Sequence, residues 1–437
     1  MWSGRPGRRS DRRCREGLYE TDDARLGAAL SGCGGVAPKA RRRAATAGCG
    51  VLHRAGTPPP RLAAPSYLRG VVRRLLRRVG VRTRGRMRLS KRRMSMMRAV
   101  YFPGDGQVDV REVPEPPAPG PGQILVAMRA SALCGTDVHT YHLPADHLPA
   151  YPVIRGHAPA GVVAAVGPNV SNVAEGNRVS IYQYLGCGTC RHCHTGYVMW
   201  CSQMQCHGAT TDGGFADLLL TDDRNCLPLP PALSLEVGAL LACTLCTAYQ
   251  GLTRIAPHGP ERLVVFGVGP VGLATVLLAR AMGADVIAVD LSAPRLAMAM
   301  EFGAIATINA AEEDVLARVL ALTDGEGADA GVEASGAVVA QQQLIGALRR
   351  GGRGCIIGMG ISAPSVNLTQ LISKQLTIHA SNVAPVTAYA PMVDLIQRKH
   401  LPVDRLVTHR FQSVEQAPEA LRLLETASTG AATFVWA

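Results

Sequence analysis

Residues 263–272 read Leu-Val-Val-Phe-Gly-Val-Gly-Pro-Val-Gly. An apolar strand pattern leads directly into a glycine-rich turn, and a helical pattern over residues 271–282 follows the turn. A G-x-G-x-x-G motif alone is weak evidence, but a strand before it and a helix after it make the motif specific. The stretch therefore predicts a dinucleotide site at the first strand of a parallel sheet.

The residue types in this turn each suit a bound dinucleotide. Gly267 permits the tight turn, Gly269 lets the backbone approach a pyrophosphate, and Gly272 lets the helix and strand pack closely. Pro270 and Val271 open the helix, whose free N–H groups and partial positive charge favour phosphate. All five residues are predicted to contact the cofactor.

Asp290 ends the next strand-like segment, 18 residues after Gly272. An acid at about this distance is expected to bond the 2′-hydroxyl of the adenosine ribose and to repel a 2′-phosphate. The sequence therefore predicts NAD rather than NADP. Arg295 lies close by in sequence, and a cation there is compatible with a phosphate, so this residue is also expected at the cofactor.

Strand and helix patterns alternate from residue 261 to about residue 380, which predicts a doubly wound parallel sheet. Helical patterns cover 271–282 and 341–350, among others. The expected strands are 263–267, 285–290, 306–309, 330–334, 354–358 and 376–380.

The part of the chain upstream of this sheet shows short β patterns separated by Gly/Pro turns, which predicts an irregular, mostly antiparallel β domain. The clearest β patterns are residues 99–102, 123–130, 161–167 and 177–182.

Four cysteines fall within fifteen residues of this β domain, in the pattern C-x2-C-x2-C-x7-C. Four thiolates at such spacing can surround Zn²⁺ and leave no open position, which is typical of a structural site. His192 and His194 lie inside the segment and are expected to be exposed loop residues. The four expected ligands are Cys187, Cys190, Cys193 and Cys201.

A second metal site is predicted from Cys134, His157 and Cys243, each beside glycines or small residues. Two sulfurs and one imidazole with an open fourth position are typical of a catalytic zinc site. Each residue alone is more often a buried structural side chain. Their occurrence together, ahead of a dinucleotide fold, favours the metal. Cys246, three residues beyond Cys243, is the alternative third ligand.

From about Met97 onward the chain resembles the medium-chain, zinc-containing alcohol dehydrogenase family, including its polyol and threonine dehydrogenase branches. The resemblance rests on Cys134-Gly-Thr-Asp-Val-His139, the four-cysteine segment, Gly267-Val-Gly-Pro-Val-Gly272 and Asp290, in that order. It implies a GroES-like β-rich catalytic domain, a Rossmann α/β domain and two zinc ions per subunit. The expected regions are an extension (1–96), the catalytic domain (97–252), the NAD domain (253–384) and a return to the catalytic domain (385–437).

The resemblance also implies roles around the catalytic zinc. Thr136 is expected to hydrogen-bond the substrate oxygen and start a proton relay that His139 ends. Asp137 is expected to accept the other ring N–H of His157. Family members usually carry Glu directly after the zinc-binding histidine, where this chain has Ala158, and that departure puts ligand exchange or activity in doubt. The substrate pocket is expected near Tyr141 and Tyr184.

The expected reaction is reversible hydride transfer between an alcohol and NAD⁺, giving an aldehyde or ketone. A threonine or polyol dehydrogenase is the nearest alternative, and a binding protein that lost turnover is the alternative of another class. Family resemblance suggests a homodimer or homotetramer. The cysteines are spaced as metal ligands rather than as disulfide partners, which favours a reducing, cytoplasmic compartment. The other cysteines of the body are expected to be buried without a role: Cys206, Cys226, Cys246 and Cys355.

The net charge of +13 belongs to the N-terminal extension. Residues 1–96 hold 25 basic and 5 acidic residues, whereas the remainder holds 21 basic and 28 acidic residues. The body therefore gives no reason to expect a nucleic-acid partner, and no apolar stretch predicts a membrane span. The extension reads as disordered, or as sequence ahead of a start at Met97. A basic amphipathic pattern over 68–79 leaves a targeting or surface-binding arm as the alternative.

Overall fold

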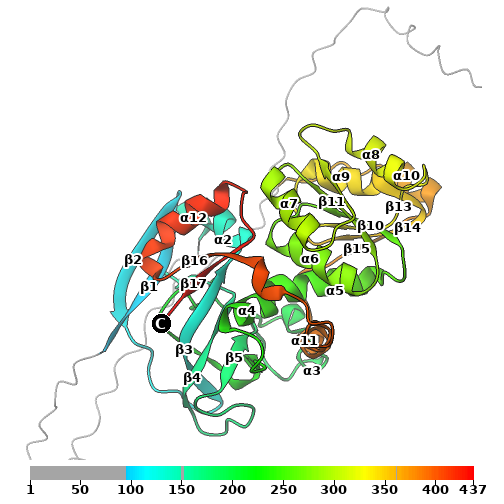
Figure 1. Cartoon of the computed structure of the whole chain (residues 1–437). Helices are drawn as coiled ribbons and strands as arrows, with labels where there is room; N and C mark the ends of the chain where they lie inside the picture. The colour runs from blue at the N-terminus through cyan, green and yellow to red at the C-terminus, as the bar shows by residue number, and fades with distance from the viewer. Residues whose placement is uncertain (1–94, 149–151, 361) are drawn as a thin grey trace, which may run out of the picture. The chain divides into compact units, whose positions relative to one another are not determined.

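The computed structural model describes residues 95–148, 152–360 and 362–437. The predictions made for residues 1–94, including the basic pattern at 68–79, lie outside the described residues. Figure 1 shows the β-rich domain, which contains both β1 and the C-terminal strand β17, and the sheet of β10 to β15 with its helices.

A seven-stranded sheet forms the centre of the β-rich domain. Its strand order is β16-β17-β3-β4-β5-β9, and β8 pairs with β3. Alternate residues of β3, including Ile124, Val126 and Met128, are fully buried, because successive side chains of a strand point to opposite faces. The strands are β1 (Met96–Gly104), β2 (Gln107–Pro114), β3 (Gln123–Leu133), β4 (Pro159–Val166), β5 (Arg178–Ile181), β6 (Tyr184–Leu185), β7 (Gln205–Cys206), β8 (Leu218–Asp222), β9 (Cys226–Pro228), β16 (Val407–Phe411) and β17 (Ala431–Val435).

The first strand begins earlier than the sequence pattern predicts. Met96 and Met97 already belong to β1, which pairs antiparallel with β2, and Met97 is 5% exposed. The prediction that both methionines precede the first strand is therefore wrong. Its cause is that methionine, unlike valine or tyrosine, carries no strong β preference that a sequence pattern could register.

Helices also form within residues 135–255 and 389–425, outside the strands named above. They are α2 (Gly135–Tyr141), α3 (Arg191–His194), α4 (Leu235–Leu240), α5 (Cys246–Ile255), α11 (Tyr389–Arg398) and α12 (Ala417–Glu425). Short 3₁₀ turns are η1 (Ala145–His147), η2 (Val198–Trp200), η3 (Asp223–Asn225), η5 (Val386–Ala388), η6 (Val403–Leu406) and η7 (Val414–Gln416).

The second sheet is fully parallel, with strand order β12-β11-β10-β13-β14-β15. Helices α5, α6 and α7 pack on one face, and α8, α9 and α10 pack on the other. Its elements are β10 (Arg262–Phe266), α6 (Pro270–Ala281), β11 (Asp285–Asp290), α7 (Ala293–Glu301), β12 (Ala306–Asn309), α8 (Val315–Leu322), β13 (Ala328–Glu333), α9 (Val338–Ala347), β14 (Leu348–Ile356), α10 (Leu368–Lys374) and β15 (Thr377–Ala380).

This architecture confirms the predicted fold class, including a Rossmann-type sheet whose order changes direction at β10. The chain runs from β10 outward to β12 and then crosses to β13 on the other side of β10. The carboxyl ends of β10 and β13 therefore flank the switch point, where such sheets bind ligands. One helix prediction is wrong at its end: α9 stops at Ala347 rather than residue 350, because Leu348 already pairs with β13.

One helical run has the length and apolar composition of a membrane-spanning helix. Residues 235–255 form α4, a π-helical turn (η4, Leu241–Leu245) and α5 without a break. The run is long and apolar enough to cross a bilayer, but 78% of its most apolar window is buried inside the fold. It packs against β3, β4, β5 and α6, so its apolar character is that of a core helix.

The C-terminal strand carries part of the β-domain core. Phe434 of β17 is fully buried and meets the rings of Phe215 at 5.0 Å and Phe411 at 6.0 Å between centroids. β17 pairs antiparallel with β3, and Phe434 lies opposite Ser131 in this pairing.

We predict that Phe434→Ala lowers the free energy of unfolding by about 3–5 kcal/mol, because it removes a buried ring and leaves a cavity. Urea denaturation of the full chain measures the loss. Val339→Ala is the matched control, since Val339 is 60% exposed, and its cost should stay within about 0.5 kcal/mol. Equal costs for the two variants would contradict this account of the core.

Candidate active site and cysteine cluster

Three segments that are distant in sequence bring two thiols and an imidazole together. Cys134 follows β3 at the start of α2, His157 precedes β4, and Cys243 lies in the π-helical turn. Their ligand atoms all lie within 4.8 Å of one another. His157 and Cys243 are buried, and Cys134 is half-buried.

The π-helical turn explains which cysteine of the helical run faces the site. A π turn adds one residue to a helical turn and often occurs at functional sites. Cys243, inside that turn, joins the group of three, whereas Cys246 begins α5 and packs in the apolar core at 2% exposure. Ala158 is also buried in this core, directly after His157.

Asp137 connects two of the three candidate ligands. Its Oδ2 accepts a hydrogen bond from the backbone N–H of Cys134 at 2.8 Å, and its Oδ1 lies 3.4 Å from Nδ1 of His157. Asp137 is itself buried in α2. The contact at Nδ1 leaves Nε2 of His157 as the ring nitrogen available to a metal.

The electrostatics of the three residues suit metal binding. A hydrogen bond from Cys243 and the nearby His157 ring hold the pKa of the Cys134 thiol well below its usual value, despite burial. Burial alone would lower the pKa of His157, but Asp137 and Cys243 outweigh it and raise that pKa. The hydrogen bond to Cys134 and burial raise the pKa of Cys243. The lowered pKa favours the thiolate form of Cys134, which is the form that binds a soft cation.

A cavity of about 290 Å³ opens onto these residues. Thr136 and His139, both exposed on α2, lie in its wall, and so does Tyr184. Thr140 lies in the wall too, so the cavity reaches the predicted surroundings of Tyr141, but Tyr141 itself is not part of the wall. Its ring packs edge-on against Phe102, with centroids 6.0 Å apart.

Several cavity residues were not predicted from the sequence: Gln183, Cys206, Thr244, Thr247, Ser335, Asn382 and Val383. Cys206 was expected to be buried without a role, but it is half-buried and reaches the cavity. Cys226 and Cys355 are buried as expected. A larger hollow of about 680 Å³ lies beside the cysteine segment, and neither the three ligands nor the glycine turn line it.

The glycine turn borders the same cavity through Gly269, Pro270 and Val271. Gly267 has φ +79°, and a Cβ there would lie 2.5 Å from Cβ of Ser335. A Cβ on Gly272 would lie 1.9 Å from the carbonyl oxygen of Gly267, so only glycine permits this close packing. Gly269 has no such neighbour, and Pro270 opens the twelve-residue helix α6. The N-terminus of α6 is therefore open to a phosphate.

Asp290 and Arg295 frame this turn. One carboxylate oxygen of Asp290 accepts the backbone N–H of Val268 at 2.7 Å and the other accepts that of Ser292 at 2.9 Å. The guanidinium of Arg295 lies over Gly269, and its Nε donates to the carbonyl oxygen of Thr429 at 3.0 Å. Burial lowers the pKa of Arg295. Arg295 thus lies beside the glycine turn and is hydrogen-bonded to the segment before β17.

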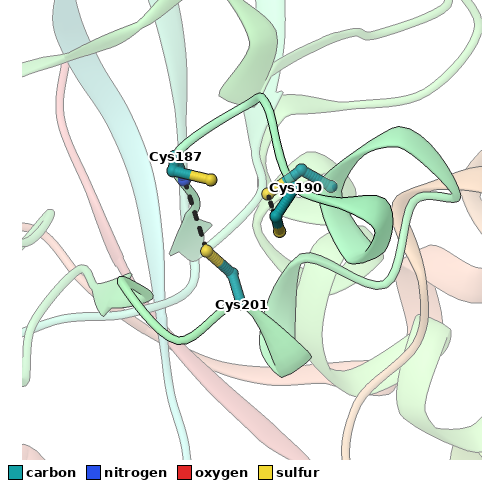
Figure 2. A group of neighbouring side chains, drawn as sticks. Cys187, Cys190 and Cys201 are labelled. Carbon is teal, nitrogen blue, oxygen red and sulfur yellow. Dashed lines mark hydrogen bonds between the residues drawn. The ribbon is translucent and has the colours of Figure 1, made fainter.

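The four cysteines of the segment 187–201 also converge, and their sulfurs lie within 4.8 Å of one another. Figure 2 shows Cys187, Cys190 and Cys201 around this centre. The sulfur of Cys201 accepts the backbone N–H groups of Cys187 and Gln203, each at 3.4 Å. Hydrogen bonds from Thr189 lower the pKa of Cys187 to about 5. No disulfide joins any cysteines of the described chain.

The two histidines of this segment differ from their prediction as exposed loop residues. Both lie in α3, and only His194 is exposed. His192 is half-buried, with its ring edge-on to Trp200 at 5.8 Å between centroids. Neither belongs to the group of four cysteines.

Comparison with known proteins agrees with this arrangement. Residues 120–231 match the alcohol dehydrogenase GroES-like domain, and residues 270–398 match the zinc-binding dehydrogenase family. The zinc-type alcohol dehydrogenase-like protein YphC of Escherichia coli is 34% identical over 348 residues, which cover 77% of this chain and 98% of that protein. L-threonine 3-dehydrogenase of Pyrococcus abyssi is 32% identical over 73% of this chain and 92% of its own length.

A solved structure extends the likeness to three dimensions. Alcohol dehydrogenase TADH from Thermus sp. ATN1 superposes with a TM-score of 0.72 at 30% identity, over 77% of this chain and 99% of that one. The predicted resemblance is therefore confirmed, and this chain belongs to the zinc-type alcohol dehydrogenase family of oxidoreductases.

Proposed function

We propose that this protein transfers a hydride reversibly between an alcohol and NAD⁺, giving an aldehyde or ketone. The observation that carries the proposal is the shared cavity. Cys134, His157 and Cys243 line it on one side, and the glycine turn that begins α6 lines it on the other. An alcohol bound at the three ligands would therefore lie beside the reactive end of a dinucleotide bound at the turn.

The donor set fits zinc, which favours thiolate and imidazole ligands in a site with one open position. A zinc ion held there would act as a Lewis acid on the alcohol oxygen, and the nicotinamide would take up the hydride. Cys134, His157 and Cys243 would hold the ion. Asp137, 3.4 Å from Nδ1 of His157, would keep the ring proton on Nδ1 and leave Nε2 free to bind the ion.

Thr136 and His139 would carry the proton away from the substrate. Thr136 Oγ1 accepts a hydrogen bond from the Cys134 thiol at 3.8 Å. A thiolate ligand cannot donate that bond, so the hydroxyl would be free to turn toward a substrate hydroxyl. His139 lies three residues further along α2, on the same helix face, and is exposed. It can pass the proton to solvent.

We also propose a second, structural zinc ion at Cys187, Cys190, Cys193 and Cys201, which gives two zinc ions per subunit. The four sulfurs leave no open position for a substrate. The low pKa of Cys187 means that a thiolate forms readily.

A threonine or polyol dehydrogenase is the second candidate, and the cavity wall favours it. The Gln183 amide is 4% exposed, and its Oε1 has no hydrogen-bond partner among the described residues. Thr247 and Asn382 add further polar groups to the wall. Buried polar groups need partners, so this lining suits a substrate with a second hydroxyl or amino group.

The proposed activity predicts zinc-dependent NADH formation from a panel of alcohols, matched vicinal diols and amino alcohols. Cys243→Ser should lower kcat/KM at least ~100-fold and remove one of two zinc ions, because the metal loses a thiolate. Cys246→Ser is the matched control, three residues away and buried, and should keep both ions and most activity. Higher kcat/KM for diols or amino alcohols than for mono-alcohols favours the second candidate.

Two outcomes of this panel would contradict the proposal. Equal losses in the two variants would exclude Cys243 as the specific ligand. A zinc-loaded wild-type protein that binds NAD⁺ but forms no NADH with any substrate would instead favour a binding protein that lost turnover.

The proposed proton relay predicts that His139→Ala lowers kcat for alcohol oxidation about tenfold at low pH and less at high pH. Hydroxide is scarcer at low pH, so the imidazole acceptor matters more there. The pH dependence of kcat measures the effect, and added imidazole should restore part of the rate. His142→Ala, at the end of the same helix, is the control. An unchanged pH profile in His139→Ala would remove this residue from the mechanism.

Asp290 leads us to propose NAD rather than NADP as the cofactor. We predict that wild-type kcat/KM is at least ~100-fold higher with NAD⁺ than with NADP⁺, because the carboxylate repels a 2′-phosphate. Asp290→Asn keeps an acceptor for the backbone but removes the charge, and should reduce this preference about tenfold. A wild-type preference for NADP⁺ would refute the assignment.

A further inference from the structure

Glu333 is the last residue of β13 and is fully buried. Its Oε1 accepts three hydrogen bonds, from the backbone N–H groups of Ser335 at 2.7 Å and Gly336 at 2.9 Å and from the Ser335 hydroxyl at 2.5 Å. Its Oε2 has no hydrogen-bond partner among the described residues. A buried carboxylate so incompletely satisfied is costly, and its presence needs an explanation.

The loop that Glu333 holds is clamped between two other segments at the switch point. Ser335 lies against Gly267, where a Cβ on the glycine would come within 2.5 Å of it. Gly336 has φ +74°, and a Cβ there would lie 2.5 Å from the carbonyl oxygen of Met359. The backbone oxygen of Glu333 also accepts the N–H of Gly358 at 3.0 Å. The Glu333 side chain thus holds the loop that lies between the turn after β10 and the segment after β14.

These segments form the dinucleotide side of the active-site cavity. Ser335, Gly358 and Met359 lie in its wall together with the three candidate zinc ligands. In the proposed reaction the nicotinamide has to lie beside those ligands. The wall that Glu333 supports is therefore the wall next to the nicotinamide.

Glu333 has no oppositely charged partner among the described residues. No Lys, Arg or His of the described chain forms an ion pair with it, whereas the acid at the opposite end of the same strand, Asp329, pairs with Arg349 at 2.6 Å. Burial raises the pKa of Glu333, and the hydrogen bonds from Ser335 and Gly336 act against that rise. Oε1 is only an acceptor in all three of its hydrogen bonds.

We propose that Glu333 is a positioning residue that also selects the redox state of the cofactor, by favouring the positively charged oxidised nicotinamide over the neutral reduced one. This inference rests on the proposed use of a nicotinamide dinucleotide. The oxidised nicotinamide carries a positive charge that would attract the Glu333 carboxylate. This attraction acts over several ångströms, because little water screens a buried charge. The reduced ring gains nothing from the carboxylate.

The isosteric variant Glu333→Gln isolates the charge, because the amide oxygen can still accept the three bonds made by Oε1. Isothermal titration of the zinc-loaded protein, without substrate, gives Kd for NAD⁺ and for NADH. Glu333→Gln should raise Kd for NAD⁺ about tenfold and leave Kd for NADH within about twofold. Ser335→Ala keeps the charge and loses one loop contact, so it should change both Kd values by the same factor.

Asp329→Asn is the matched control, since it removes a charge from the same strand at the opposite edge of the sheet. It should leave the ratio of the two Kd values unchanged. An equal change of both Kd values in Glu333→Gln, or no change in either, would overturn the inference and leave the proposed function intact. A wild-type protein that binds neither nucleotide would overturn the proposed function and this inference with it.

Discussion

The candidate active site depends on the two contacts that the Asp137 carboxylate makes. One oxygen of its carboxylate holds the backbone N–H at Cys134, and the other faces Nδ1 of His157. Helix α2, which carries Thr136 and His139 into the cavity, is thereby tied at its first turn to the segment before β4. A buried acid with both oxygens engaged restrains the two ligands more firmly than packing of small residues could.

The third candidate ligand, Cys243, is positioned by a different structural feature. Cys243 lies inside a long apolar helical run whose other residues form core, and a π turn presents its thiol to the other two ligands. The same run continues as α5 and packs on α6, which begins at the glycine turn. The helical run that carries Cys243 therefore also packs against the helix that follows the glycine turn. The proposed hydride transfer needs that packing, because donor and acceptor must meet at short range.

Much of this arrangement could be predicted from the sequence, and the exceptions have physical causes. The glycine turn and the four-cysteine segment are local patterns, so their spacing predicts them without knowledge of the fold. The choice of Cys243 over Cys246 followed family resemblance, because a regular helical period does not anticipate a π turn. The sequence predicted a pocket near Tyr141 but not the direction of its ring, which packs on Phe102. Glu333 was read as part of a strand pattern, and its three loop contacts appear only in three dimensions.

Anomalous diffraction at the zinc edge, on crystals of the protein grown with NAD⁺, would locate the zinc ions relative to the nicotinamide. We expect one peak bonded to Cys134 Sγ, His157 Nε2 and Cys243 Sγ, at about 2.0–2.3 Å from each, and facing the nicotinamide across the cavity. A peak only among the four cysteines of residues 187–201, or side chains at Cys134, His157 and Cys243 too far apart to share an ion, would contradict this expectation.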